Sequence, residues 1–144
     1  MHTLDGYLSV VVQPARLART LAILFYGMSP LASQAPSRQA LVLPLECSTA
    51  DCALLRGAPQ TAGMRSGFVR LKPGQSVGSH STGQNEESLI ILHGAGDALI
   101  EGQSKRSFVA PQFLYIPPAT THNVENSGRE VLEYVYVVAP ASGK

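Results

Sequence analysis

The sequence has little charge and little cysteine, and each shortage excludes a class of protein. Only 15% of the 144 residues are charged, and 11 basic residues balance 10 acidic ones. A nucleic-acid-binding protein usually has a clustered basic face, so we expect no nucleic-acid partner. The only cysteines, Cys47 and Cys52, are separated by four residues, whereas redox and zinc motifs use two. We interpret them as reduced thiols, with a local disulfide as the alternative.

A long hydrophobic run is also missing. Residues 16–35 combine arginines, a short apolar run and small residues, which loosely resembles a secretory signal. The apolar part is too short to cross a bilayer, and a glycine and a proline interrupt it. We therefore predict a cytoplasmic protein with no membrane partner, or an exported one if residues 16–35 act as a signal. Residues 1–40 are interpreted as an N-terminal extension and possible leader, with a strand at 7–14 and either a short helix or a strand at 15–27.

Turn-forming residues, by contrast, are frequent: the chain has 13 glycines and 10 prolines. They separate short apolar segments of the length and composition of β-strands. The segments expected to be strands are 40–46, 65–71, 78–82, 87–93, 97–102, 107–110, 112–117, 122–126 and 131–138. Many short strands with regular turns favour a sandwich or a small barrel. The sequence therefore predicts an all-β domain over residues 41–144, large enough to have one hydrophobic core.

Glu87 is the side chain most in need of an explanation. Alternation along a strand places it on the same face as Leu89 and Ile91. Burying an unpaired carboxylate costs several kcal/mol, so Glu87 needs a cation or a hydrogen-bond partner. No lysine or arginine occurs between residues 73 and 104. A bound metal would neutralise the carboxylate, and a pair of histidines would do so more weakly.

The spacing around Glu87 resembles the first motif of the cupin family, G(X)5HXH(X)3–4E(X)6G. Gly74, His80, Glu87 and Gly94 stand at its fixed positions, and Thr82 replaces the second histidine. A threonine hydroxyl is a weak metal ligand, so this departure leaves the motif with one imidazole and one carboxylate.

A second stretch resembles the other cupin motif, G(X)5PXG(X)2H(X)3N. Pro117, His122 and Asn126 fit it, whereas Ala119 replaces the inner glycine and Pro111 stands in place of the leading one. The two motifs lie within residues 64–140. Together they identify the chain as similar to the small, single-domain, RmlC-like cupins.

This resemblance implies a fold and a site. The implied fold is a double-stranded β-helix, a jelly-roll barrel that usually forms a homodimer. The implied metal ligands are His80, Glu87 and His122. Two imidazoles and a carboxylate resemble the facial triad of non-haem iron sites, which leaves coordination positions open. Iron, nickel, manganese, cobalt and zinc all suit such ligands, and the metal's identity stays open.

Other polar residues lie close to these ligands in the sequence. Gln84 is a candidate fourth ligand. Thr82, Thr121 and Asn126 are candidate acceptors for the second imidazole nitrogen of the histidines, although Asn126 would equally well fix the strand that carries His122.

Two arginines and two further polar residues complete the set of candidates. Arg65 and Arg70 would meet an anionic substrate if they faced inward. Glu86 and His93 are interpreted as solvent-exposed.

Two function classes remain open. The first is a metal-dependent enzyme acting on an unidentified small molecule, of the oxygenase, isomerase or lyase type. The second is a non-catalytic cupin that binds a sugar or another small metabolite. The absence of a DNA-binding helix-turn-helix in the sequence argues against a transcription regulator.

Overall fold

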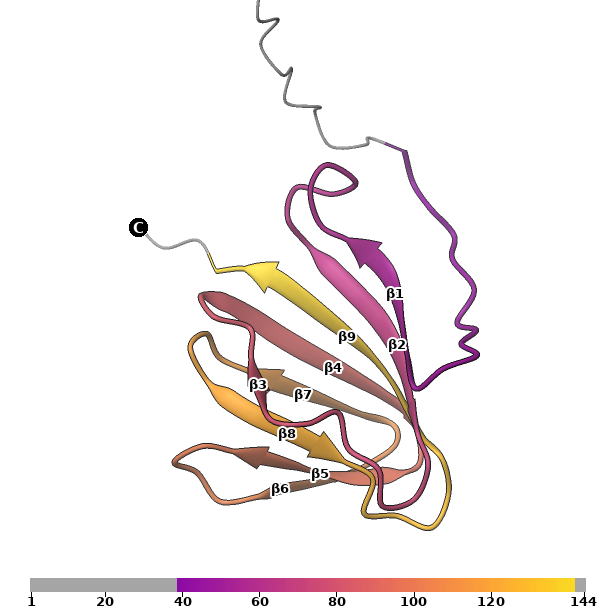
Figure 1. Cartoon of the computed structure of the whole chain (residues 1–144), viewed down its shortest axis with the longest axis vertical. Coiled ribbons are helices and arrows are strands. Elements are labelled where there is room, and N and C mark those ends of the chain that lie inside the picture. The colour runs from indigo at the N-terminus through magenta and orange to yellow at the C-terminus, as the bar shows by residue number, and fades with distance from the viewer. Residues whose placement is uncertain (1–38, 142–144) are drawn as a thin grey trace, which may run out of the picture. The chain divides into compact units, whose positions relative to one another are not determined.

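The computed structural model describes residues 39–141, which form nine strands and no helix (Figure 1). The strands are β1 (Asp51–Arg56), β2 (Arg65–Leu71), β3 (His80–Ser81), β4 (Asn85–His93), β5 (Ala95–Ile100), β6 (Arg106–Val109), β7 (Gln112–Ile116), β8 (Thr121–Glu125) and β9 (Leu132–Pro140). The prediction of an all-β domain is therefore confirmed. No helix within the described residues is long and apolar enough to cross a membrane.

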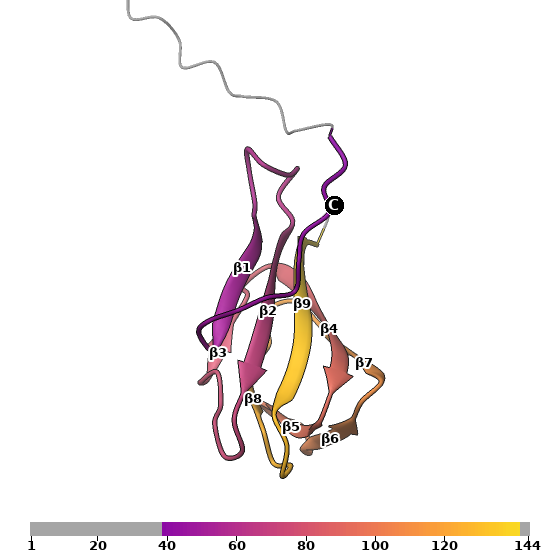
Figure 2. The ribbon, with the colours of Figure 1, turned by 90° about the vertical axis from the view of Figure 1, so that its right-hand side faces the viewer.

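The strands form two antiparallel sheets that face each other. One sheet has the order β1-β2-β9-β4-β7, and the other has the order β3-β8-β5-β6. Figure 2 shows the first sheet with its strands side by side. Because β9 lies between β2 and β4, strands distant in the sequence become neighbours. The site described below depends on this order.

The hydrophobic core fills the space between the two sheets. Alternate residues of each strand point inward, as the period of a half-buried strand requires. The core consists of Val69, Leu71, Leu89, Ile91, Ala98, Ile100, Phe108, Ile116, Val124, Leu132 and Tyr134. Leu89 and Ile91 are each only 1% exposed, and Glu87 on the same face is 5% exposed. The sequence correctly predicted this shared inward face.

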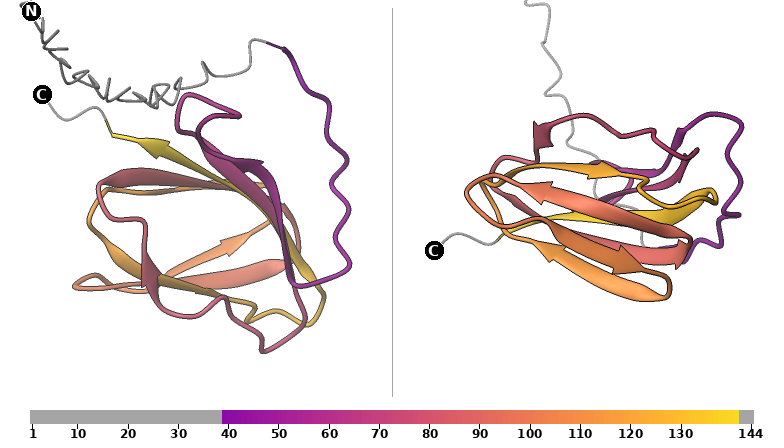
Figure 3. Two further views of the ribbon diagram at one scale, coloured as in Figure 1. Left: turned by 45° about the horizontal axis from the view of Figure 1, so that its top comes forward. Right: turned by 90° about the horizontal axis from the view of Figure 1, so that it is seen from below.

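Within residues 39–141, the first strand is not where the sequence predicted it. Residues 40–46 form no strand and are exposed, and they lead along the outside of the domain towards β1 (Figure 3). The first strand is instead β1, which pairs with β2 at the sheet edge. Apolar content made 40–46 resemble a strand, but strand formation also requires a partner for the backbone. The predicted elements at 7–14 and 15–27 lie outside the described residues.

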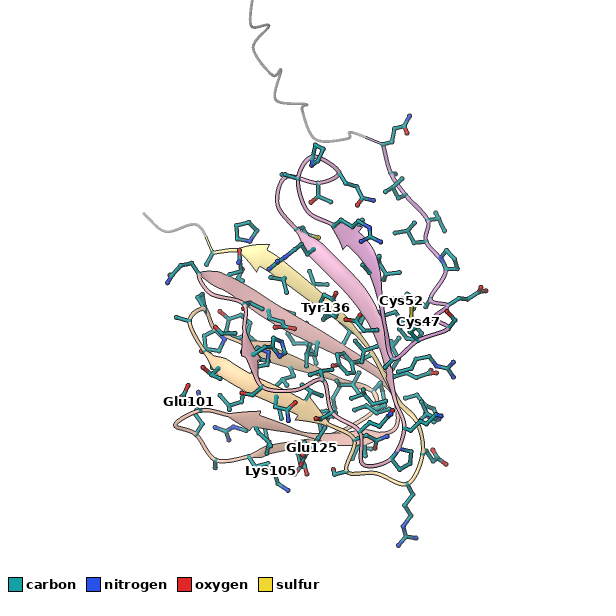
Figure 4. The ribbon with its side chains drawn as sticks, viewed as in Figure 1. Cys47, Cys52, Glu101, Lys105, Glu125 and Tyr136 are labelled. Atoms are coloured by element: carbon teal, nitrogen blue, oxygen red, sulfur yellow. A yellow bond between two sulfur atoms is a disulfide. The ribbon has the colours of Figure 1, made fainter. Side chains whose placement is uncertain are left out.

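The two cysteines are joined. Cys47 and Cys52 form a disulfide beside the start of β1 (Figure 4), so the prediction of reduced thiols is wrong. The chain turns between the two residues and brings their Cα atoms to 5.6 Å, which lies within the range that a disulfide spans. The spacing of redox and zinc motifs did not reveal this disulfide, because two cysteines with another spacing can also form one when the chain between them turns back.

Candidate metal centre

The three predicted ligands come together between the sheets. His80 on β3 and His122 on β8 are cross-strand partners, so both imidazoles project from the same face of their sheet. Their ring centroids are 4.4 Å apart. Glu87 projects toward them from β4 in the opposite sheet. One ligand atom from each residue lies within 4.8 Å of the others.

Backbone carbonyls orient both imidazole rings. His122 Nδ1 lies 3.1 Å from the carbonyl oxygen of Thr120, and His80 Nδ1 lies 3.0 Å from that of Gly78. A carbonyl can only accept, so each Nδ1 donates and carries the proton. In the neutral ring the other nitrogen, Nε2, then has a free lone pair. This arrangement is common for metal-binding histidines, whose second nitrogen usually donates to an oxygen.

Glu87 and His122 leave two buried polar atoms without a hydrogen bond. Glu87 Oε2 and His122 Nε2 are 3.1 Å apart, but the contact lacks hydrogen-bond geometry, and neither atom has another partner among residues 39–141. Burial lowers the pKa of His122, but the Glu87 carboxylate and the Thr120 carbonyl outweigh burial and raise this pKa above its ordinary value. Without a metal, the negative charge of Glu87 therefore has a positive partner only when the His122 imidazole is protonated on both nitrogens.

A cavity of about 370 Å³ opens beside the three side chains. Its lining includes four polar residues from the β1-β2-β9 part of the larger sheet: Asp51, Arg65, Tyr134 and Tyr136. Asp51 was missed because β1 was missed. Burial raises the pKa of the Asp51 carboxyl group. The two tyrosines were not among the candidates from the sequence, because alternation alone does not reveal which inward residues border a cavity.

The structure shows that the two arginines, whose direction the sequence left open, lie on opposite faces of β2. Arg65 lines the cavity. Arg70 lies on the outer face of the same strand, where its Nε donates to Glu133 Oε1 at 2.8 Å. Only Arg65 is therefore placed to meet a ligand in the cavity.

The loop residues near the first motif have different positions. Thr82 lines the cavity, and its hydroxyl donates to the carbonyl of Asn85 at 2.9 Å, which fixes the turn from β3 to β4. Gln84 is exposed in that turn and is not among the residues that line the cavity. Glu86 points to the outer face, where it accepts a hydrogen bond from Tyr115.

Asn126 has a structural position. It is 2% exposed, and its Nδ2 donates to the carbonyls of Leu71 and Glu130 at 2.8 and 2.7 Å. Its Oδ1 accepts from the amide of Gly128 at 2.9 Å. These bonds fix the turn that follows β8, which agrees with the alternative role given to this residue above. Thr121 precedes His122 on β8 and lines a different depression, outside the cavity described above.

The remaining described histidine, His93, lies outside this cluster. Its Nδ1 is 2.9 Å from the carbonyl of Val131. Its Nε2 is 3.6 Å from Glu130, and more than half of the imidazole is exposed. The prediction that His93 is solvent-exposed is confirmed.

The comparison with known families decides the identity of the domain. A family model described as "Cupin domain" matches residues 67–138. The chain belongs to the cupin family. No match was found among curated proteins.

Solved cupin structures share the fold at low sequence identity. An RmlC-like cupin family protein with a double-stranded β-helix fold from Methanocaldococcus jannaschii is 19% identical, with a TM-score of 0.57, over 70% of this chain and 91% of that one. A Cupin 2 conserved barrel domain protein from Salinispora arenicola is 24% identical, with a TM-score of 0.55, over 75% of this chain and 92% of that one. The cupin domain of Schizosaccharomyces pombe Cnp3 is 17% identical, with a TM-score of 0.57; the match spans only 64% of either chain. The predicted double-stranded β-helix is thus confirmed.

Proposed function

We propose that this cupin binds one divalent transition metal through His80, Glu87 and His122 and acts on a small molecule in the adjoining cavity. The observation that carries the proposal is the pair of buried atoms, Glu87 Oε2 and His122 Nε2, that lack hydrogen bonds within residues 39–141. Buried polar atoms nearly always have partners. A cation among the three side chains would give both atoms one.

The donor set fits a transition metal. Imidazole nitrogen and carboxylate oxygen together suit iron, nickel, manganese, cobalt or zinc. Each imidazole is already oriented by a backbone carbonyl at its Nδ1, which leaves Nε2 available for the metal. Three protein ligands also leave coordination positions for water or substrate.

The protein residues and the metal would have separate parts in the reaction. When bound, the metal would supply Lewis-acid chemistry, or oxygen chemistry if it is iron. The cavity side chains would hold the substrate. Glu87 and His122 are buried and His80 is exposed, so water and substrate would reach the metal from the His80 side. A volume of about 370 Å³ lies near the lower end of the range for ligand pockets, which favours a small substrate.

Metal content tests the proposal directly. Protein purified without chelator should contain about one transition-metal ion per chain by inductively coupled plasma mass spectrometry, and His122→Ala should lose it. His93→Ala is the matched control, because that imidazole lies outside the cluster, and it should keep the metal. A wild-type protein that stays metal-free after incubation with each of the five metals in turn would overturn the proposal.

The same preparations separate the two function classes. Oxygen consumption with small phenols, thiols and diketones would identify an oxygenase, and product analysis without oxygen uptake would identify isomerase or lyase chemistry. Substrate that binds and is recovered unchanged with every metal would favour the non-catalytic alternative. The homodimer remains a prediction.

A further inference from the structure

We propose that Arg65 binds a carboxylate of the substrate, so that the substrate is a short molecule with a metal-binding oxygen group at one end and a carboxylate at the other. The inference rests on the proposed metal site and specifies what that site would act on. It follows from the strand register, from the surroundings of Arg65 and from the charge of the cavity.

The strand register places Arg65 in line with the metal ligands. Arg65 pairs with Val138, and Val138 pairs with Glu87 on its other side. The three residues therefore form one inward-facing row across β2, β9 and β4. Neighbouring strands are about 4.8 Å apart, so the Cα atoms of Arg65 and Glu87 are separated by roughly 10 Å. The two side chains extend into the same cavity, so a molecule only a few atoms long would reach from one to the other.

No carboxylate within residues 39–141 forms an ion pair with Arg65. On the neighbouring strand β1, the acidic residue that lines the cavity is Asp51, which pairs with Val69 of β2. Val69 lies four positions along β2 from Arg65, which corresponds to roughly 13 Å. Arg65 therefore differs from Arg70, whose charge is already paired with Glu133 on the outer face.

Arg65 is exposed overall, but its stem passes close to the loop after β1. A Cβ atom added at Gly57 would lie 3.3 Å from Arg65 Cγ, so the side chain packs closely against the backbone of the loop after β1. A guanidinium with a positioned stem loses less conformational freedom when it binds a ligand. Its planar donors match the two oxygens of a carboxylate.

The charge of the loaded cavity favours an anion. Glu87 and Asp51 contribute two negative charges, and Arg65 and a divalent metal contribute three positive ones, with the ligating imidazoles neutral. The net charge would be positive by one unit. A substrate carrying one carboxylate would neutralise it. Tyr136 also lines the cavity, and its ring lies over Gly67 of β2.

Two hydroxamates with the same metal-binding end test this inference. Succinic monohydroxamic acid has a carboxylate at its far end, and butyrohydroxamic acid has a methyl group there. Isothermal titration calorimetry on the metal-loaded protein should show the first binding roughly 10- to 100-fold tighter than the second, the range expected for a charge-assisted contact. In Arg65→Met this preference should disappear while the metal content stays unchanged. Arg70→Met, on the same strand, is the matched control and should keep the preference.

The outcomes distinguish this inference from the proposed function. Equal affinity of the wild type for both hydroxamates would refute the role of Arg65 and leave the metal site standing. A preference that survives in Arg65→Met would refute it equally. If the metal analysis and the binding of butyrohydroxamic acid both fail, the metal site is wrong and the inference fails with it.

Discussion

Replacing Glu87 by glutamine should change the stability of this protein in opposite directions with and without metal. In the metal-free protein at pH 8, the substitution removes a buried negative charge whose Oε2 has no hydrogen bond within the described residues. Leaving a buried polar group unsatisfied costs about 1–3 kcal/mol. We therefore expect metal-free Glu87→Gln to be more stable than the wild type by about 1 kcal/mol. With metal, the order should reverse.

The size of the reversal follows from binding linkage. Metal at 100 times its dissociation constant stabilises the wild type by about 2.7 kcal/mol. For a domain of about one hundred residues, this raises the melting temperature by about 10–20 °C. Glu87 is one of three proposed ligands, so we expect the variant to bind at least 100-fold more weakly. At the same metal concentration it would then gain only about 0.4 kcal/mol, or a few degrees.

Differential scanning fluorimetry with chelator and with added metal measures both effects. Glu86→Gln is the matched control: its carboxylate, the next along the chain, accepts from Tyr115 on the outer face. This control should respond to metal like the wild type. If Glu87→Gln gained as many degrees from metal as the wild type does, the carboxylate would not be a ligand, and the reasoning from its buried oxygen would be refuted.

Three further changes test other parts of the description. The pKa of His122 is raised in the folded protein. The protonated imidazole therefore stabilises the metal-free fold below its ordinary pKa of about 6.5, and this stabilisation is lost as pH rises through the raised pKa. Urea titrations in chelator should show this loss of stability with pH, and the loss should be smaller in Glu87→Gln. In Gly67→Ala, the new Cβ would lie 2.5 Å from the Tyr136 ring; we expect a loss of about 1–3 kcal/mol in urea unfolding and a shifted ring in a crystal structure, with metal content unchanged. Asn126→Ala removes the three hydrogen bonds of a buried amide and should destabilise the fold by about 3 kcal/mol in the same assay, while equal stability would contradict the structural role given to this amide.

Much of the barrel could be predicted from the sequence because its turns are marked. Glycine and proline separate the strands from residue 64 onward, and β2 begins and ends where it was expected. The inward face of β4 also followed from alternation, since Glu87, Leu89 and Ile91 share it. β1 could not be found in this way, because it is an edge strand in which no residue is fully buried, and its pairing with β2 is not visible in its own composition.

The candidate site was only partly predictable for the same reason. The motif spacing selected the three residues that cluster in the structure, but it carried no information about the pairing of His80 with His122 or about the backbone carbonyls that orient them. Arg65 and Tyr136 became site residues only through the position of β9 between β2 and β4. Register between strands far apart in the sequence is a property of the assembled sheet, and one sequence gives no direct signal for it.

The central place of β9 has a consequence for how the protein is made. It is the last of the described strands to leave the ribosome, yet it joins the β1–β2 hairpin to the β4–β7 pair. Until it emerges, β2 and β4 each present an unpaired edge, the kind of surface that invites wrong partners. The partly synthesised domain therefore exposes both of these strand edges until β9 is made, and the pairing of β9 covers both edges at once.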